Sequence, residues 1–68
     1  MTNPFNNATW TDTQIIKQMG PSRRAECLWY ATHAVMCDAC DRRVAAQFLW
    51  RNANSIINEA IAELEAET

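Results

Sequence analysis

The chain has 68 residues, with six basic and eight acidic side chains and a formal net charge of −2. Such a length forms one small domain, residues 1–68, which buries only about 60% of its unfolded surface. The acidic excess argues against general nucleic-acid binding, which needs a surplus of positive charge to displace counterions. A single glycine also excludes a glycine-rich phosphate loop.

The cysteine content and the hydropathy pattern indicate in which cellular compartment the protein resides. Three cysteines, an odd number, do not form the disulfide framework of a small secreted protein. The sequence has no signal-peptide pattern and no apolar run of about 18 residues, so we expect neither secretion nor a membrane span. We therefore predict a cytoplasmic protein.

Residues 11–19 carry the clearest local helix signals in the sequence. Thr11 and Gln14 have the spacing of a capping box, in which each side chain satisfies the other residue's backbone N–H. After the helix, Gly20 suits a left-handed conformation, and Pro21 cannot continue the helix. We therefore predict a short helix over residues 11–19 that ends at Gly20.

A second helix is predicted over residues 22–39, where apolar residues recur with the 3.6-residue period of an amphipathic helix. We expect this stripe to face the core. It consists of Ala25, Leu28, Trp29, Thr32, Val35, Met36 and Ala39.

The rest of the chain is predicted to be a third helix over residues 41–66. Two stretches could break the chain before or within it, residues 37–41 and residues 52–55. We favour the first break, because it gives two helices of similar length and supplies Asp38 or Asp41 as an N-cap.

The predicted fold class is therefore all-α, a short N-terminal helix followed by a helical hairpin, with residues 1–8 as a flexible arm. Apolar positions in the last helix repeat at intervals of three and four, as in a coiled-coil seam. We expect this seam to join the hairpins into a homo-oligomeric bundle. Its residues are Phe48, Leu49, Ile56, Ile57, Ile61 and Leu64.

A group of possible metal ligands lies in the second helix. His33, Cys37 and Cys40 read H-x3-C-x2-C, and Cys27 could complete a zinc set. On a continuous helix, His33 and Cys40 lie about 10.5 Å apart along the axis, too far to share one ion with Cys37. Zinc would need a break near Cys37 or ligands from two subunits. The alternative, which we favour, is no cofactor, with the cysteines as small buried hydrophobic residues.

Binding is a better expectation than catalysis, because the single histidine has no evident nucleophile or orienting partner. Arginine and aromatic residues are enriched at interfaces. Cations in the first turn of a helix are mildly unfavourable, so the paired arginines hint at contact with an anion. Solvated helix faces are the alternative interpretation. The candidate ligand-binding or partner-binding residues are Arg23, Arg24, Tyr30, Arg42, Arg43, Trp50 and Arg51.

The stretch RRAECLWYATHAVMCDACDRR, residues 23–43, and the closing AIAE, residues 60–63, resemble a family of small all-helical bacteriophage anti-defence proteins. In that family, helical hairpins assemble into oligomeric sponges for cyclic oligonucleotides. The resemblance implies a ligand held between subunits by aromatic and basic residues.

The leading functional hypothesis is a non-enzymatic interaction protein, a phage-encoded inhibitor that docks on a host protein complex in the host cytoplasm. The first alternative is an oligomeric sponge that sequesters a cyclic nucleotide or a similar anionic signal. The second alternative is a zinc-stabilised helical module. A membrane partner is not expected.

Overall fold

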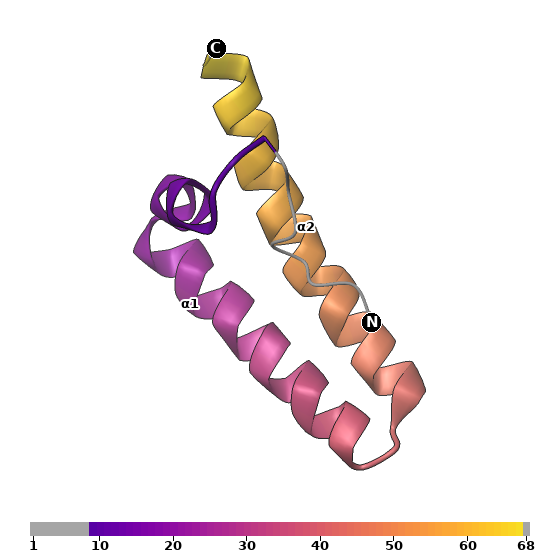
Figure 1. The fold of residues 1–68 in the computed structure, drawn as a ribbon. Coiled ribbons are helices and arrows are strands. Elements are labelled where there is room, and N and C mark those ends of the chain that lie inside the picture. The colour runs from indigo at the N-terminus through magenta and orange to yellow at the C-terminus, as the bar shows by residue number, and fades with distance from the viewer. Residues whose placement is uncertain (1–8, 68) are drawn as a thin grey trace.

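The computed structural model describes residues 9–67, which form two helices, α1 (Asp12–Ala39) and α2 (Arg43–Glu67). The helices run antiparallel and are joined by a short turn (Figure 1). Over these residues there is no strand, so the predicted all-α class and the hairpin are confirmed. The predicted arm at residues 1–8 lies outside the described part. Within residues 9–67, no helix has both the length and the apolar composition needed to span a membrane.

The start of α1 is fixed by the predicted capping box. The hydroxyl oxygen of Thr11 accepts a hydrogen bond from the backbone N–H of Gln14 at 3.2 Å. In return, Oε1 of Gln14 accepts from the backbone N–H of Thr11 at 2.9 Å. These bonds satisfy two of the N–H groups that a helix leaves without partners at its N-terminus, and the prediction is confirmed.

A break at Gly20 divides α1 into a leading segment and a longer main segment (Figure 1). Gly20 has φ 77° and ψ 172°, a conformation that is essentially restricted to glycine. Pro21 then begins the main segment, where its missing N–H loses no helical hydrogen bond. Because of the break, the leading segment turns away from the axis of the main segment and packs across α2.

The turn between the helices is closed by a Schellman motif. Asp41 has a positive φ of 59°, and the N–H of Arg42 donates to the carbonyl of Cys37 at 2.8 Å. The carbonyl of Arg42 accepts from Ala46, which makes Arg42 the N-cap of α2. The predicted N-cap at Asp38 or Asp41 is therefore wrong. A reversal this tight needs a left-handed residue, and aspartate tolerates that conformation better than most.

Small residues form the contact between the two helices. Ala46, Ala53 and Ala60 recur every seven residues in α2 and are at most 1% exposed. Cys27 and Ala34, also seven apart, are the buried small residues of α1. Seven residues are close to two helical turns, so each set lies on one face, and its small side chains allow the backbones to approach closely. Larger side chains complete the core, namely Ile15, Met19 and Ile57.

The face of α1 that we predicted to be buried is exposed, so that prediction is wrong. Leu28 is 65% exposed, Val35 54% and Met36 58%. The opposite face, with Cys27 and Ala34, is buried instead. Both faces are apolar, and α2 packs against the one with the smaller side chains. We call the exposed set the outer stripe of α1, and its members are Ala25, Leu28, Trp29, Thr32, Val35, Met36 and Ala39.

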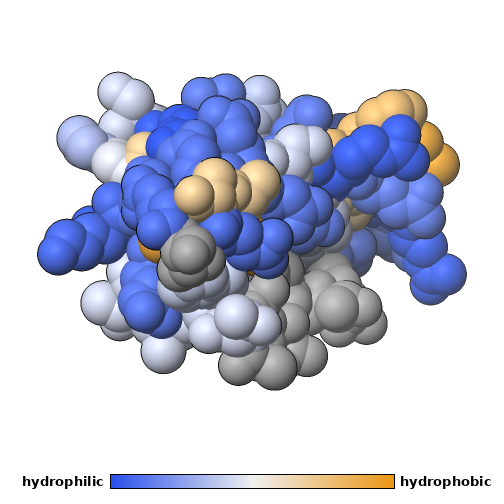
Figure 2. All heavy atoms as spheres, turned by 90° about the horizontal axis from the view of Figure 1, so that it is seen from above, coloured by the Kyte–Doolittle hydropathy of each residue, from blue (hydrophilic) through white to orange (hydrophobic). Residues whose placement is uncertain are grey.

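Seen from the end at which the C-terminus lies, the surface is mostly hydrophilic (Figure 2). Hydrophobic residues show in this view only as separate small patches. The exposed large apolar residues of α1 are Leu28, Trp29, Val35 and Met36.

Candidate interaction site at the hairpin turn

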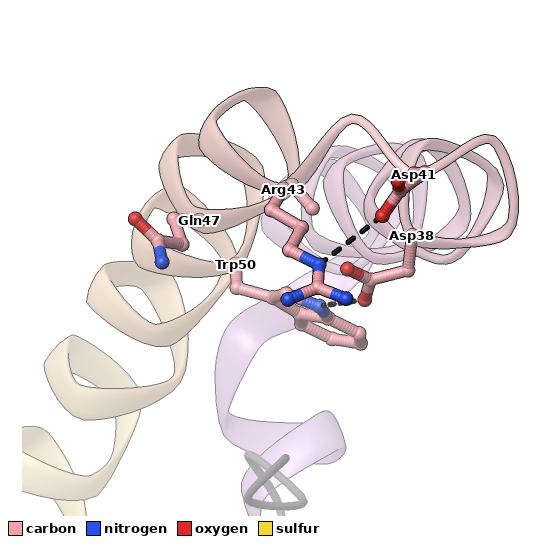
Figure 3. Close-up of a pocket in the computed structure, with 6 residues that line it drawn as sticks. Asp38, Asp41, Arg43, Gln47 and Trp50 are labelled. Carbon is pink, nitrogen blue, oxygen red and sulfur yellow. Dashed lines mark hydrogen bonds and ion pairs between the residues drawn. The ribbon is translucent and has the colours of Figure 1, made fainter.

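A hollow of about 460 Å³ lies beside the hairpin turn. The last turn of α1 and the first two turns of α2 supply its walls (Figure 3). Because the Schellman turn brings these two helix ends together, residues of both helices converge there. The lining residues are Asp38, Asp41, Arg43, Ala46, Gln47 and Trp50.

Two polar contacts arrange the side chains of this hollow. The indole Nε1 of Trp50 donates to Oδ2 of Asp38 at 3.2 Å, which ties α2 to α1 near the turn. Arg43 Nε donates to Oδ1 of Asp41 at 3.2 Å, but both side chains are more than 80% exposed. Exposed ion pairs contribute little to stability, so this arginine is readily available to a partner.

Apolar and cationic side chains continue around α2 from the hollow. The guanidinium carbon of Arg51 lies over the ring of Phe48, 5.5 Å from its centroid, a cation–π geometry. Phe48 and Val44 are exposed large hydrophobic residues. Together with the hollow they form what we call the turn-end surface: Asp38, Asp41, Arg43, Val44, Gln47, Phe48, Trp50 and Arg51.

Arg23, predicted to bind a ligand, is engaged within the chain at the opposite end of the hairpin. Its guanidinium makes a fork-like pair with Glu63, and Nη1 also donates to Glu59 at 2.9 Å. Nε and Nη2 donate to the backbone carbonyls of Met19 and Gln18, which lose their helical partners at the break. Arg23 therefore caps the leading segment and holds it against α2.

We call this set of contacts, made by Gln18, Arg23, Glu59 and Glu63, the clasp. It shifts the pKa values of two of its members, Glu63 and Arg23. Hydrogen bonds donated by Arg23 and Gln18 lower the pKa of Glu63 from 4.5 to about 2. The hydrogen bond to Glu63 in turn raises the pKa of Arg23 above its ordinary value. The anion that the sequence led us to expect near Arg23 is thus supplied by the chain's own α2.

The other predicted binding residues lie apart from one another. Arg24 is exposed at the break, where it lines two hollows. Tyr30 is half-buried against the core, with its ring edge-on to Trp29 at 5.4 Å. Arg42, Arg43, Trp50 and Arg51 are all close to the turn in the sequence, and two of them, Arg43 and Trp50, line the same hollow.

His33, Cys37 and Cys40 line a common hollow of about 340 Å³, together with Met36 and Arg42. His33 Nδ1 donates to the backbone carbonyl of Trp29 at 2.9 Å, and the two rings stack at 3.9 Å. In the described chain, no three His, Cys, Asp or Glu side chains are close enough to hold one metal ion.

Cys27, the fourth candidate ligand, is buried in the core. Its thiol faces the carbonyl oxygen of Ala53 at 3.8 Å. Burial raises the pKa of this thiol, because the apolar surroundings disfavour the thiolate. A neutral thiol in this place acts as a small apolar side chain between the helices.

Most of the residues that we assigned to a self-association seam pack instead against the core of the single chain. Ile57 is fully buried between the helices, whereas Phe48 is 59% exposed. Leu49 is half-buried. Three others pack against the core as half-buried residues, namely Ile56, Ile61 and Leu64.

Sequence reasoning missed Asp38 and Gln47 as parts of the hollow and Glu63 as the partner of Arg23. The sequence did contain one indication of a site for an arginine: Glu59 and Glu63 are four residues apart and so lie on the same face of α2. The sequence matches no protein-family profile, and neither a curated protein nor a solved structure is significantly similar to it.

Proposed function

We propose that the protein is a non-enzymatic binding protein that docks on another protein through the turn-end surface. One observation carries the proposal: the indole of Trp50 and the guanidinium of Arg43 line an open hollow, and two exposed apolar side chains, those of Val44 and Phe48, lie on the same turns of α2. Aromatic residues and arginine are the side chains most enriched at the centres of interfaces.

The charges of the turn end indicate the chemistry of the partner. Three arginines lie there, Arg42, Arg43 and Arg51, against two carboxylates, those of Asp38 and Asp41. Asp41 is already paired with Arg43 and Asp38 accepts from Trp50. A surface that combines carboxylates with an apolar residue would complement this arrangement. We take this partner to be a protein complex of the host, as in the leading hypothesis from the sequence.

The sponge alternative has less support. It needs basic and aromatic side chains that converge on one anion, but Arg23 is paired with Glu59 and Glu63. The carboxylates of Asp38 and Asp41 line the hollow and would repel an anion there.

The zinc-module alternative has no supporting geometry, since His33, Cys37 and Cys40 share a hollow without forming a ligand group. Self-association by the α2 seam also stays a prediction, and the burial of Ile57 within the chain weakens it.

Site-specific photo-crosslinking in lysate of the natural host tests the proposal. A photoreactive phenylalanine analogue replaces Phe48 in one sample and Asn58 in the control, because both residues are exposed on α2. We expect a discrete adduct with another protein from position 48 and none from position 58. The substitution Arg51→Glu should remove the adduct. Equal labelling from both positions, or an adduct unaffected by Arg51→Glu, would contradict docking through the turn-end surface.

A further inference from the structure

We infer that the outer stripe of α1 is a self-complementary surface that packs antiparallel against the same stripe of a second copy of the chain. The inference does not depend on docking at the turn end, and the turn-end surface shares only Asp38 with the border of this stripe.

The outer stripe is symmetric about its middle residue, Thr32. Leu28 and Met36 lie four residues on either side of Thr32, and Trp29 and Val35 lie three residues on either side. The ends of the stripe, Ala25 and Ala39, are also equidistant from the centre, at seven residues. All seven residues of the stripe are exposed in the single chain.

This symmetry is what a twofold interface between two copies requires. In such an interface residue i contacts residue j, and residue j contacts residue i. With the axis at Thr32, Leu28 of one copy is level with Met36 of the other, and Trp29 is level with Val35. Each large apolar residue therefore meets a large apolar residue. Alanines meet at both ends, where small side chains let the helices approach.

Charge at the border of the stripe favours the same register. Arg24 and Asp38 are exposed on the same flank of α1, because 14 residues are close to four helical turns. In the antiparallel pair, Arg24 is level with residue 40 of the other copy, about 3 Å along the axis from its Asp38. Because of the twofold symmetry the contact occurs twice, so two Arg24–Asp38 ion pairs form across the interface. Within residues 9–67 of the single chain, no carboxylate pairs with Arg24.

A hollow next to the stripe provides room for the second copy. It has a volume of about 200 Å³ and is lined mainly by apolar side chains, among them Ile16, Leu28 and Ala31. Arg24 stands at its edge. Val35 of the second copy is level with Trp29, and so lies between the levels of Leu28 and Ala31 on this flank, where its side chain can fill the hollow.

Sedimentation equilibrium over a range of protein concentrations tests the inference. We expect the wild-type chain to dimerise and Val35→Glu to raise the dimer dissociation constant by at least about a hundredfold, since two carboxylates would be buried near the axis. Ala62→Glu is the control, because Ala62 is an exposed apolar residue of α2 that belongs neither to the outer stripe nor to the turn-end surface. It should leave the dissociation constant unchanged. Circular dichroism shows whether each variant keeps its helical signal.

A charge-reversal cycle tests the register. Arg24→Asp and Asp38→Arg should each weaken the dimer by about tenfold, and the double variant should restore it, because the ion pair is re-formed with opposite signs. A monomeric wild type would overturn the inference, as would equal effects of Val35→Glu and Ala62→Glu. A dimer whose double charge variant is no tighter than the single variants would overturn the antiparallel register.

Discussion

The two helices of the hairpin differ in how many of their sides are apolar. Over residues 27–37, about three turns, α1 carries no Asp, Glu, Lys or Arg side chain. The charged residues of α2 are Arg43, Arg51, Glu59, Glu63, Glu65 and Glu67, so no stretch of α2 as long as residues 27–37 is without charge. A helix with apolar residues on two opposite sides can bury both only by packing between two other helices. A helix with one apolar side needs only one partner helix. In the single chain, α1 has only one of its two neighbours.

The same difference explains the error in assigning the core. A period of 3.6 residues places apolar residues on a face, but it cannot choose between two apolar faces of one helix. The choice depends on α2, whose alanines at positions 46, 53 and 60 fit the smaller side chains of Cys27 and Ala34. For α2 the period groups Ile57 with an apolar face but does not say what covers that face. We assigned Ile57 to a seam between subunits, and the structure buries it within the single chain.

The largest expected effect comes from a charge on the inner face of α2. Ile57 is 1% exposed, so Ile57→Asp buries a carboxylate without a partner and should unfold the chain, a loss of about 4 kcal/mol or more. Phe48→Asp, on the exposed side of α2, should keep the helical circular dichroism signal. If Ile57→Asp melted like the wild type, the inner face of α2 would be wrongly assigned.

A smaller loss is expected at the break in α1. Gly20→Ala should lower the free energy of unfolding by about 1–3 kcal/mol, because φ 77° with ψ 172° is strained for any residue with a Cβ. No atom lies within 4 Å of the added Cβ, so crowding does not contribute. Urea unfolding gives the value, and Ser22→Ala, exposed in the same region, is the neutral control. Equal stability of Gly20→Ala and wild type would mean that the break is not fixed at this residue.

Because of the clasp, the free energy of unfolding should fall at acidic pH. The pKa of Glu63 is about 2 in the folded chain and 4.5 without its partners, so the stabilisation is complete above pH 4.5. It should be lost as the pH falls from 4.5 through about 2, because the unfolded chain takes up the proton first. Glu63→Gln should be less stable at neutral pH and should show a shallower loss in acid.

Thermal unfolding between pH 2 and pH 6 measures that slope. Glu67→Gln removes a carboxylate from the same helix without touching Arg23, so it should retain the wild-type slope. A Glu63→Gln variant with an unchanged slope would show that Glu63 is not the titrating partner of Arg23.

The smallest expected effect is a gain at the turn between the helices. Asp41 is left-handed with φ 59°, and glycine adopts this conformation without steric strain. Asp41→Gly should therefore raise the free energy of unfolding by up to about 1 kcal/mol. Ala39→Gly, two residues earlier and at the last position of α1, should lower it, since glycine weakens a helix. A loss of stability in both variants would contradict the left-handed role of Asp41.

Local signals in the sequence predicted the ends of the leading segment. Thr11 with Gln14, and Gly20 with Pro21, each act over a few residues, so no knowledge of the rest of the fold is needed. The partners of Arg23 lie 36 and 40 residues further along the chain, where only packing brings them together. The hollow at the turn was missed for the same reason, because Asp38 and Trp50 belong to different helices.

Three of the contacts between the helices close loops of increasing size, and this indicates an order of folding. Trp50–Asp38 spans 12 residues, Cys27–Ala53 spans 26, and Arg23–Glu63 spans 40. Loop-closure entropy makes the last contact about 1 kcal/mol less favourable than the first if it forms alone. The contacts near the turn should therefore form first during folding, and the clasp should form last, after the rate-limiting step. Disrupting the clasp should then accelerate unfolding and leave the folding rate almost unchanged.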